Sequence, residues 1–187
     1  MMNKIIDIKS YQPQKDDIFF FDTNIWMYLY CPMGDYKKHI RQLYSNFFKK
    51  VVARKSSILI ASFVLSEFFN AYTRLEFNVL KNKEPETYQD FKKDFRNSEH
   101  YKSTVLAIKN VVQHNILKVA QRIDDKFHHL NVDELFTDIE LSDFNDKYIV
   151  FLANDEEMKV VTNDSDFHTM NLKTAILTAN KQLLLSQ

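Results

Sequence analysis

Four short apolar runs along the chain are typical of buried β-strands. They lie at residues 18–22, 58–62, 159–162 and 175–178, and the first of them, IFFFD, ends abruptly in an acid. Each run is short and continuous rather than alternating, as expected for strands that are covered on both faces of a sheet. The pattern therefore predicts four buried strands.

Between these runs the apolar positions change to helical spacing. Residues 40–52 carry apolar side chains at i, i+3, i+4 and i+7, which is the pattern of an amphipathic helix. The same spacing predicts helices at about residues 63–80, 98–123 and 145–153. Pro85 suits the first turn of a further helix. Because strands that alternate with helices pair in parallel through right-handed crossovers, we expect one parallel sheet with helices on both faces.

The composition favours one globular domain over residues 1–187. With 45% hydrophobic and 27% charged residues the chain is ordinary for a globular protein, and no linker or repeat divides it. The single glycine, Gly34, excludes glycine-rich phosphate loops and dinucleotide fingerprints, which need several glycines. The single cysteine, Cys31, excludes a disulfide framework and a cysteine-rich zinc site.

No stretch near the N-terminus has the apolar run of a signal peptide, and no run approaches the ~18 apolar residues of a membrane helix. We therefore expect a cytoplasmic protein with no membrane partner.

Charge is unevenly distributed, although 25 Lys and Arg balance 25 Asp and Glu. Residues 36–55 hold seven Lys or Arg and no acid, whereas residues 133–166 hold eleven acids and two Lys. Each run could be a solvated face, but the asymmetry also suits a polyanion-binding rim beside an acidic metal pocket. Lys37, Lys38 and Arg41 are the candidates for contacts to backbone phosphates.

Acidic residues follow the predicted strands. Asp22 ends the first strand, Glu67 lies five residues past the second, and Asp164 comes two residues after the third. Functional groups of parallel sheets gather beyond the carboxyl ends of the strands. Asp143 and Asp146, three residues apart at the start of a predicted helix, can project from one of its faces. We therefore expect these carboxylates to converge on one pocket.

Converging carboxylates repel each other, so either some are protonated or a cation is present. Oxygen ligands without His or Cys select Mg²⁺ or Mn²⁺ over zinc, and such ions assist phosphodiester hydrolysis by activating a water and stabilising the leaving oxygen. Taken singly, each acid has a structural explanation, because Asp22 or Asp164 could cap a helix and Glu67 could pair with Arg74. Their joint placement favours a metal-dependent hydrolase.

Four acidic segments of the chain resemble the motifs of PIN-domain (PilT N-terminus) ribonucleases. These are FFFDTNIW, the Glu of SEFFNAY, FNDKYIVFLA and VVTNDSDF, in that family's order and over about residues 18–178. The resemblance implies a three-layer α/β/α sandwich with a short parallel sheet. It also implies a Mg²⁺- or Mn²⁺-dependent endoribonuclease directed at single strands. Residues 76–123 would form a helical insertion that the compact VapC-type toxins of this family lack.

The resemblance also implies roles for individual residues. The acidic ligands, which would be catalytic, correspond to Asp22, Glu67, Asp146 and Asp164, and Asp166 corresponds to an extra metal-binding acid of the fourth motif. Asn24 and Thr162 match polar residues that orient the ligands or the reacting water. Asp143 is an additional acid, and either it or Asp146 could face the metal.

Two other classes of protein are alternatives. A haloacid-dehalogenase-type phosphatase needs a second Asp two residues after its nucleophile, where this chain has Asn24. A catalytically silent PIN fold that binds RNA or protein would not need all four acids. The expected partners are an RNA substrate and, if the chain is a toxin, an antitoxin protein; RNA processing without an antitoxin and a homodimer are both open.

Overall fold

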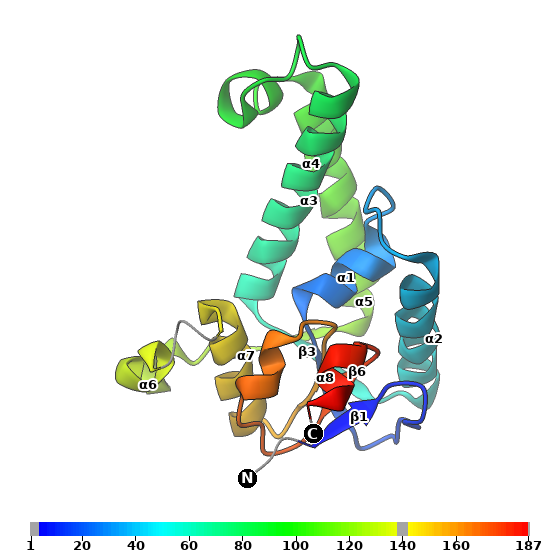
Figure 1. Cartoon of the computed structure of the whole chain (residues 1–187), viewed down its shortest axis with the longest axis vertical. Helices are drawn as coiled ribbons and strands as arrows, with labels where there is room; N and C mark the ends of the chain where they lie inside the picture. The colour runs from blue at the N-terminus through cyan, green and yellow to red at the C-terminus, as the bar shows by residue number, and fades with distance from the viewer. Residues whose placement is uncertain (1–3, 138–141, 187) are drawn as a thin grey trace.

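A six-stranded parallel sheet lies at the centre of the computed structural model, which describes residues 4–137 and 142–186 (Figure 1). Across the described residues the strand order is β1-β6-β5-β2-β3-β4. The strands are β1 (Ile5–Asp7), β2 (Ile18–Phe21), β3 (Ser57–Ile60), β4 (Gln121–Arg122), β5 (Lys159–Val161) and β6 (Ile176–Thr178). The four predicted strands correspond to β2, β3, β5 and β6, so the predicted parallel sheet is confirmed.

Sequence reasoning missed the two edge strands, β1 and β4. β1 has three residues and β4 has two, and both residues of β4 are exposed, so neither strand has a buried apolar run. The helix predicted for residues 98–123 was wrong at its end, because Gln121 pairs with Leu59 and Arg122 with Ile60. This pairing satisfies backbone groups of β3 that would otherwise form an open edge.

Helices connect the strands. They are α1 (Thr23–Tyr30), α2 (Lys38–Arg54), α3 (Ser62–Lys83), α4 (Glu99–Val111), α5 (Leu117–Val119), α6 (Val132–Phe136), α7 (Phe144–Asp155) and α8 (Lys181–Leu185). Single turns of other helical types are η1 (Phe91–Phe95), η2 (Val112–Ile116), η3 (Phe127–His129) and η5 (Asp166–Thr169). In the described part of the chain, no helix has both the length and the apolar character needed to cross a bilayer.

The helix predicted to begin at Pro85 was wrong. The chain makes one turn there, in which the Tyr88 N–H donates to the Glu84 carbonyl at 3.1 Å. Helical geometry begins later, in η1, because the Asp90 carboxylate accepts hydrogen bonds from the backbone N–H groups of Lys92 and Lys93 at 2.8 and 2.7 Å. A carboxylate that accepts from these positions caps the start of a helical turn.

Consecutive phenylalanines of β2 show that helices cover both faces of the sheet. The Phe19 ring lies 5.7 Å from Phe47 of α2, and the Phe20 ring lies 6.2 Å from Phe63 of α3. Neighbouring residues of a strand point to opposite faces, so α2 and α3 lie on opposite sides of β2. On the α3 side, the ring of Tyr148 from α7 packs against Phe63 at 5.0 Å. The fold is a three-layer α/β/α sandwich.

A long pair of helices extends away from this sandwich (Figure 1). It consists of the C-terminal half of α3, the loop with η1, and α4, over residues 74–111, and is called the arm below. The arm has a hydrophobic cluster of its own, formed by Phe77, Leu80, Tyr88 and Phe95. The arm lies largely within residues 76–123, where the sequence predicted a helical insertion.

Candidate active site

A cleft of about 420 Å³ opens where three neighbouring strands end. Asp22 follows β2 directly, Asp164 lies beyond β5, and Glu67 is on α3, which follows β3. In the sheet β2 lies between β3 and β5, the kind of position at which parallel sheets bind ligands. The cleft is lined by Asp22, Thr23, Asn24, Met27, Tyr28, Tyr36, Glu67, Ala71, Arg74, Leu75, Asn78, Asp143, Asp146 and Asp164.

Asp22 is held in place by two polar side chains. The residue is only 5% exposed, and its Oδ2 accepts a hydrogen bond from Thr162 Oγ1 at 2.7 Å and another from Asn24 Nδ2. Asn24 Nδ2 also lies 3.2 Å from Thr162 Oγ1, so the three side chains form one network. Asn24 and Thr162, two of the three residues predicted as supporting, therefore both contact this carboxylate.

Glu67 has a partner that sequence reasoning missed. The Thr23 hydroxyl donates to Glu67 Oε2 at 2.8 Å, across 44 residues of sequence. Thr23 directly follows Asp22, and the only sequence signal for its role is this adjacency. The hydroxyl orients the Glu67 carboxylate at the edge of the cleft.

Asp143 and Asp146 both line the cleft but differ in their surroundings. Asp143 caps α7, because its Oδ1 accepts from the backbone N–H of Asn145 at 2.8 Å and of Asp146 at 3.2 Å. Asp146 lies one turn further along and is buried, with 7% of its surface exposed. The capping bonds use only Oδ1 of Asp143, so both carboxylates stay candidates to serve a ligand in the cleft.

Asp164 and Asp166 occupy different positions after β5. Asp164 lines the cleft, and its backbone N–H donates to Thr162 Oγ1 at 3.0 Å. Asp166 is exposed at the start of η5 and is outside the cleft lining, although its N–H donates to Asp164 Oδ1 at 3.0 Å. Asp166 therefore acts on the cleft through its charge and through Asp164.

The carboxylates of the cleft are hard to ionise together. Burial raises the pKa of Asp22 to about 7, and the charges of Glu67 and Asp164 add to the rise while the Thr162 hydrogen bond opposes it. Burial, with the charges of Asp22 and Asp143 next, raises the pKa of Asp146 to about 8. Burial also raises the pKa of Glu67. A cation in the cleft would relieve this repulsion.

The donors of the cleft fit a hard divalent cation bound partly through water. They are carboxylate oxygens, which Mg²⁺ and Mn²⁺ prefer. In residues 4–137 and 142–186, no three His, Cys, Asp or Glu side chains are close enough to bind one ion directly. Mg²⁺ usually keeps several waters and takes only one or two carboxylates, so this spacing suits it.

The predicted RNA-binding residues Lys37, Lys38 and Arg41 lie at the start of α2 and do not line the cleft. Arg41 Nε donates to the carbonyl of Tyr28 at 3.3 Å. Tyr28 and Tyr36 both line the cleft, and their rings lie 4.7 Å apart. Lys37 and Lys38 are exposed. The two tyrosines, which sequence reasoning did not place in the site, connect the basic start of α2 to the carboxylates.

Glu67 does not pair with Arg74, the partner that the sequence suggested for it. Arg74 also lines the cleft, but its guanidinium carbon lies 4.1 Å from the centre of the Phe91 ring in the arm. No ion pair joins Glu67 to Arg74 in the part of the chain that the structure describes. Arg74 therefore brings a positive charge to an otherwise acidic cleft.

The acidic run at residues 133–166 does not form a single pocket. Asp155 and Glu156 both pair with Lys126, outside the cleft lining. Asp138 and Glu140 lie outside the described residues. Of this run, Asp143, Asp146 and Asp164 line the cleft.

The model of the PIN domain family matches residues 19–172, a range that contains all the acids lining the cleft. A comparison with curated protein sequences gives no match. Among solved structures, the chain is similar to a chain of the crystal structure of VapBC2 from Rickettsia felis bound to a DNA fragment from their promoter. The identity is 18%, the TM-score is 0.49, and the match covers 87% of this chain and 99% of that chain.

Proposed function

The chain belongs to the PIN domain family, and from this premise we propose that it is a Mg²⁺- or Mn²⁺-dependent endoribonuclease that hydrolyses phosphodiester bonds of single-stranded or structured RNA. PIN domains are generally nucleases. The observation that carries the proposal is the convergence of Asp22, Glu67, Asp146 and Asp164 on one cleft. Three of these residues, Asp22, Glu67 and Asp146, have raised pKa values, as expected of a site built for a cation.

In this proposal one or two of the four carboxylates bind the ion directly and the others hold it through its waters, while Asp166 supports them through its charge. When bound, the divalent ion would neutralise charge on the phosphate and favour ionisation of the attacking water. Thr162 and Asn24 hold the Asp22 carboxylate in one orientation, and Thr23 does the same for Glu67.

The basic start of α2 would bind the RNA backbone beside the cleft. Lys37 and Lys38 are exposed, and Arg41 is anchored to the Tyr28 carbonyl, so its charge stays near the rim. Positive side chains at such a rim attract phosphates and displace their counterions. A nucleic acid is therefore the substrate class that the charge distribution favours, and RNA is our proposal within it.

A catalytically silent binding module fits the cleft less well. Buried carboxylates that repel each other destabilise the fold, and a protein that made no use of them would gain stability by losing them.

A toxin with an antitoxin partner differs from an RNA-processing enzyme in one cellular readout. Expression of the toxin should arrest growth, and Asp22→Asn should relieve the arrest. Sedimentation of the purified protein tests for a homodimer.

The proposed activity is tested with purified protein, total cellular RNA and either Mn²⁺ or a chelator, followed by mapping of the cut ends. Wild-type protein should cut RNA only with the metal. Asp22→Asn should lower kcat/KM by on the order of 10³-fold or more, because one ligand charge is lost; this is about 4 kcal/mol of transition-state stabilisation.

Asp16→Asn is the matched control for Asp22→Asn. Asp16 is exposed and precedes β2, at the opposite end of the strand from Asp22, so this variant should cut RNA like the wild type. Circular dichroism should show both variants folded. Full activity of folded Asp22→Asn would refute the assignment of the cleft.

A further inference from the structure

One face of α3 connects the cleft to the arm. Glu67, Ala71, Arg74, Asn78 and Lys81 follow each other at spacings of four and three residues, so they share one face of the helix. The first four of these residues line the cleft. At 1.5 Å per residue, the face runs for roughly 21 Å from Glu67 to Lys81.

This face of α3 is open to solvent along the arm. Arg74, Asn78 and Lys81 are exposed, whereas Phe77 and Leu80, on other faces of the same helix, are buried in the hydrophobic cluster of the arm. The packing of the arm therefore leaves a polar surface that starts in the cleft and is continuous with it.

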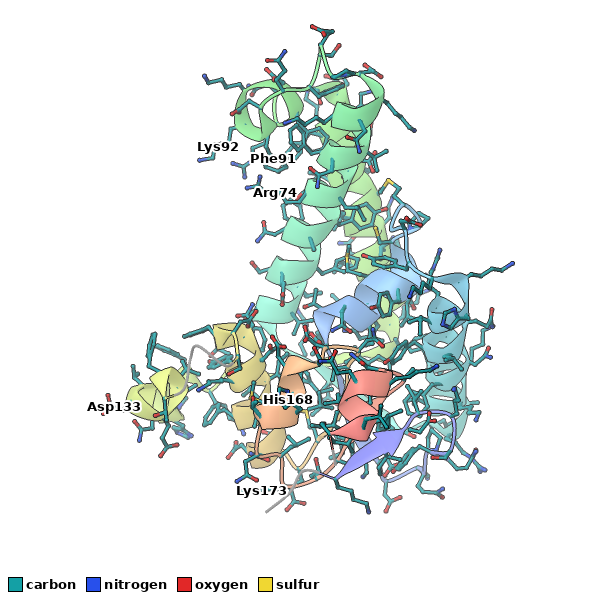
Figure 2. The ribbon with its side chains drawn as sticks, viewed as in Figure 1. Arg74, Phe91, Lys92, Asp133, His168 and Lys173 are labelled. Atoms are coloured by element: carbon teal, nitrogen blue, oxygen red, sulfur yellow. The ribbon has the colours of Figure 1, made fainter. Side chains whose placement is uncertain are left out.

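Positive groups surround one aromatic ring at the end of this surface. Phe91 is only partly buried, with the guanidinium carbon of Arg74 4.1 Å from its ring centre and that of Arg96 5.9 Å from it. Lys92 is exposed beside them, and Figure 2 shows Arg74, Phe91 and Lys92 on the same side of the arm. This surface, formed by Arg74, Asn78, Phe91, Lys92 and Arg96, is called the arm surface.

The acids near the arm surface accept hydrogen bonds from the backbone of the loop. Asp90 accepts hydrogen bonds from the backbone N–H groups that follow it, and Asp94 Oδ2 accepts from the N–H groups of Gln89 and Asp90 at 2.9 and 2.7 Å. Their carboxylates are thus directed at the backbone of the loop. Asp90 stays exposed and charged beside Phe91, and the cations that lie over the ring are Arg74 and Arg96.

We propose that the arm surface is a second RNA-binding site, which holds the single-stranded segment of the substrate that leaves the cleft. Single strands bind where positive groups follow the backbone and aromatic or guanidinium planes stack on bases, and this surface offers both. The inference rests on the proposed nuclease function, because it deepens the recognition of the same substrate.

Continuity with the cleft favours RNA over a protein partner. A strand cut beside Glu67 passes Arg74 and Asn78 before it reaches Phe91, so a bound substrate would cross this surface without a bend around another element. Because Arg74 belongs both to the cleft and to the arm surface, the two sites form one path.

The test measures binding of a labelled single-stranded RNA of about 20 nucleotides, a length beyond the ~4–16 nucleotides of many single-strand sites. Every protein carries Asp22→Asn to prevent cutting. The double variant Lys92→Gln, Arg96→Gln should lower the affinity on the order of 10-fold. It should also reduce the slope of log K against log salt by about 1.4, since each lost phosphate contact on a single strand removes about 0.7.

The control Lys50→Gln, Arg54→Gln removes an equal charge at the same spacing. Both residues are exposed in the last turns of α2, just before β3 begins. They are therefore near the amino ends of the strands, whereas the cleft lies at the carboxyl ends. This pair should leave the slope unchanged. Two results would overturn the proposal. One is an unchanged salt slope in the arm variant (Lys92→Gln, Arg96→Gln), as expected if the arm binds a protein instead. The other is an equal fall of the slope in the arm variant and in the control.

Failure of the arm proposal differs from failure of the proposed function. If wild-type protein cuts RNA with Mn²⁺ while the arm variant binds RNA normally, the nuclease stands and the arm proposal falls. If wild-type protein neither cuts nor binds RNA, both fall. Thermal unfolding of the arm variant, expected to match the wild type because both replaced side chains are exposed, shows that the effect is not one of folding.

Discussion

The sandwich and the arm differ in the size of their hydrophobic cores. Phe19, Phe20 and Phe21 of β2 are almost completely buried, with helices on both faces of the strand. The hydrophobic cluster of the arm consists of only four buried residues, with Phe91 and Tyr101 at its edge. A large core can hold repelling carboxylates in a fixed geometry, whereas a small cluster supports a helix pair that opens more easily. The sandwich therefore suits chemistry, and the arm suits extended contact with a substrate.

The largest difference in stability between the two regions should come from replacing one buried phenylalanine in each with alanine. Phe20 and Phe95 are both fully buried, and Phe→Ala in a core typically costs about 3–5 kcal/mol. Phe20→Ala should lower the free energy of unfolding of the whole domain by this amount. Phe95→Ala should instead open the arm locally, so that hydrogen exchange quickens in residues 77–108 but not in the sheet.

Hydrogen exchange read by mass spectrometry, with thermal unfolding alongside, distinguishes these outcomes. Phe95→Ala should still cut RNA with metal, since the carboxylates are carried by the sandwich. An equal fall of the melting temperature in both variants, with exchange raised throughout, would mean that arm and sandwich unfold as one unit.

The same contrast explains how much could be predicted from the sequence. The central strands are specified by their own apolar runs, and Asp22, Glu67 and Asp164 were placed at one edge by the rule for parallel sheets. The structure brings these residues to one cleft with Asp143 and Asp146. Their catalytic roles stay predictions.

What sequence reasoning missed depends on contacts between distant segments. The Thr23 hydroxyl reaches Glu67 across 44 residues, and β4 exists because its two residues pair with β3. Arg74 is another residue whose contact joins distant segments. It shares a helix face with Glu67, but its guanidinium lies over the ring of Phe91. Phe91 begins a helical turn that the Asp90 carboxylate caps. No local pattern encodes such partners.

A smaller effect should come from the network that orients Asp22. Thr162 is fully buried, and its hydroxyl donates to Asp22 and accepts from the Asp164 N–H. Thr162→Val keeps the volume but removes both of these bonds and the one that the hydroxyl accepts from Asn24 Nδ2. Loss of a group that orients a metal ligand typically costs about 10- to 100-fold in metal affinity or activity, so the Mn²⁺ concentration for half-maximal cleavage should rise by that range.

Thr178→Val is the matched control for this substitution. Thr178 is also a fully buried threonine at the end of a neighbouring strand, but its hydroxyl accepts from the Asn180 N–H at 3.0 Å and lies outside the cleft. This variant should lose stability without a change in its metal requirement. An equal shift in both variants would mean that Thr162 acts through packing alone.

A further effect of the sandwich should be a dependence of stability on pH that metal removes. The pKa of Asp22 rises from 3.8 to about 7 and that of Asp146 from 3.8 to about 8 on folding. Between those values the folded state binds more protons than the unfolded state, so stability must fall as pH rises through this window. The melting temperature of metal-free protein should therefore drop between about pH 5 and pH 8.

Mg²⁺ should stabilise the protein more at about pH 8 than at about pH 5, because the ion binds the ionised carboxylates that the folded state otherwise holds at a cost. Asp22→Asn should flatten the metal-free pH dependence, because the neutral side chain no longer titrates. Asp17 does not interfere, since the hydrogen bond from Lys159 is the largest factor that lowers its pKa, and its titration lies below the window. Metal-free protein that gains stability from about pH 5 to pH 8 would show that the carboxylates of the sandwich are not held together under repulsion, and the contrast with the arm would lose its basis.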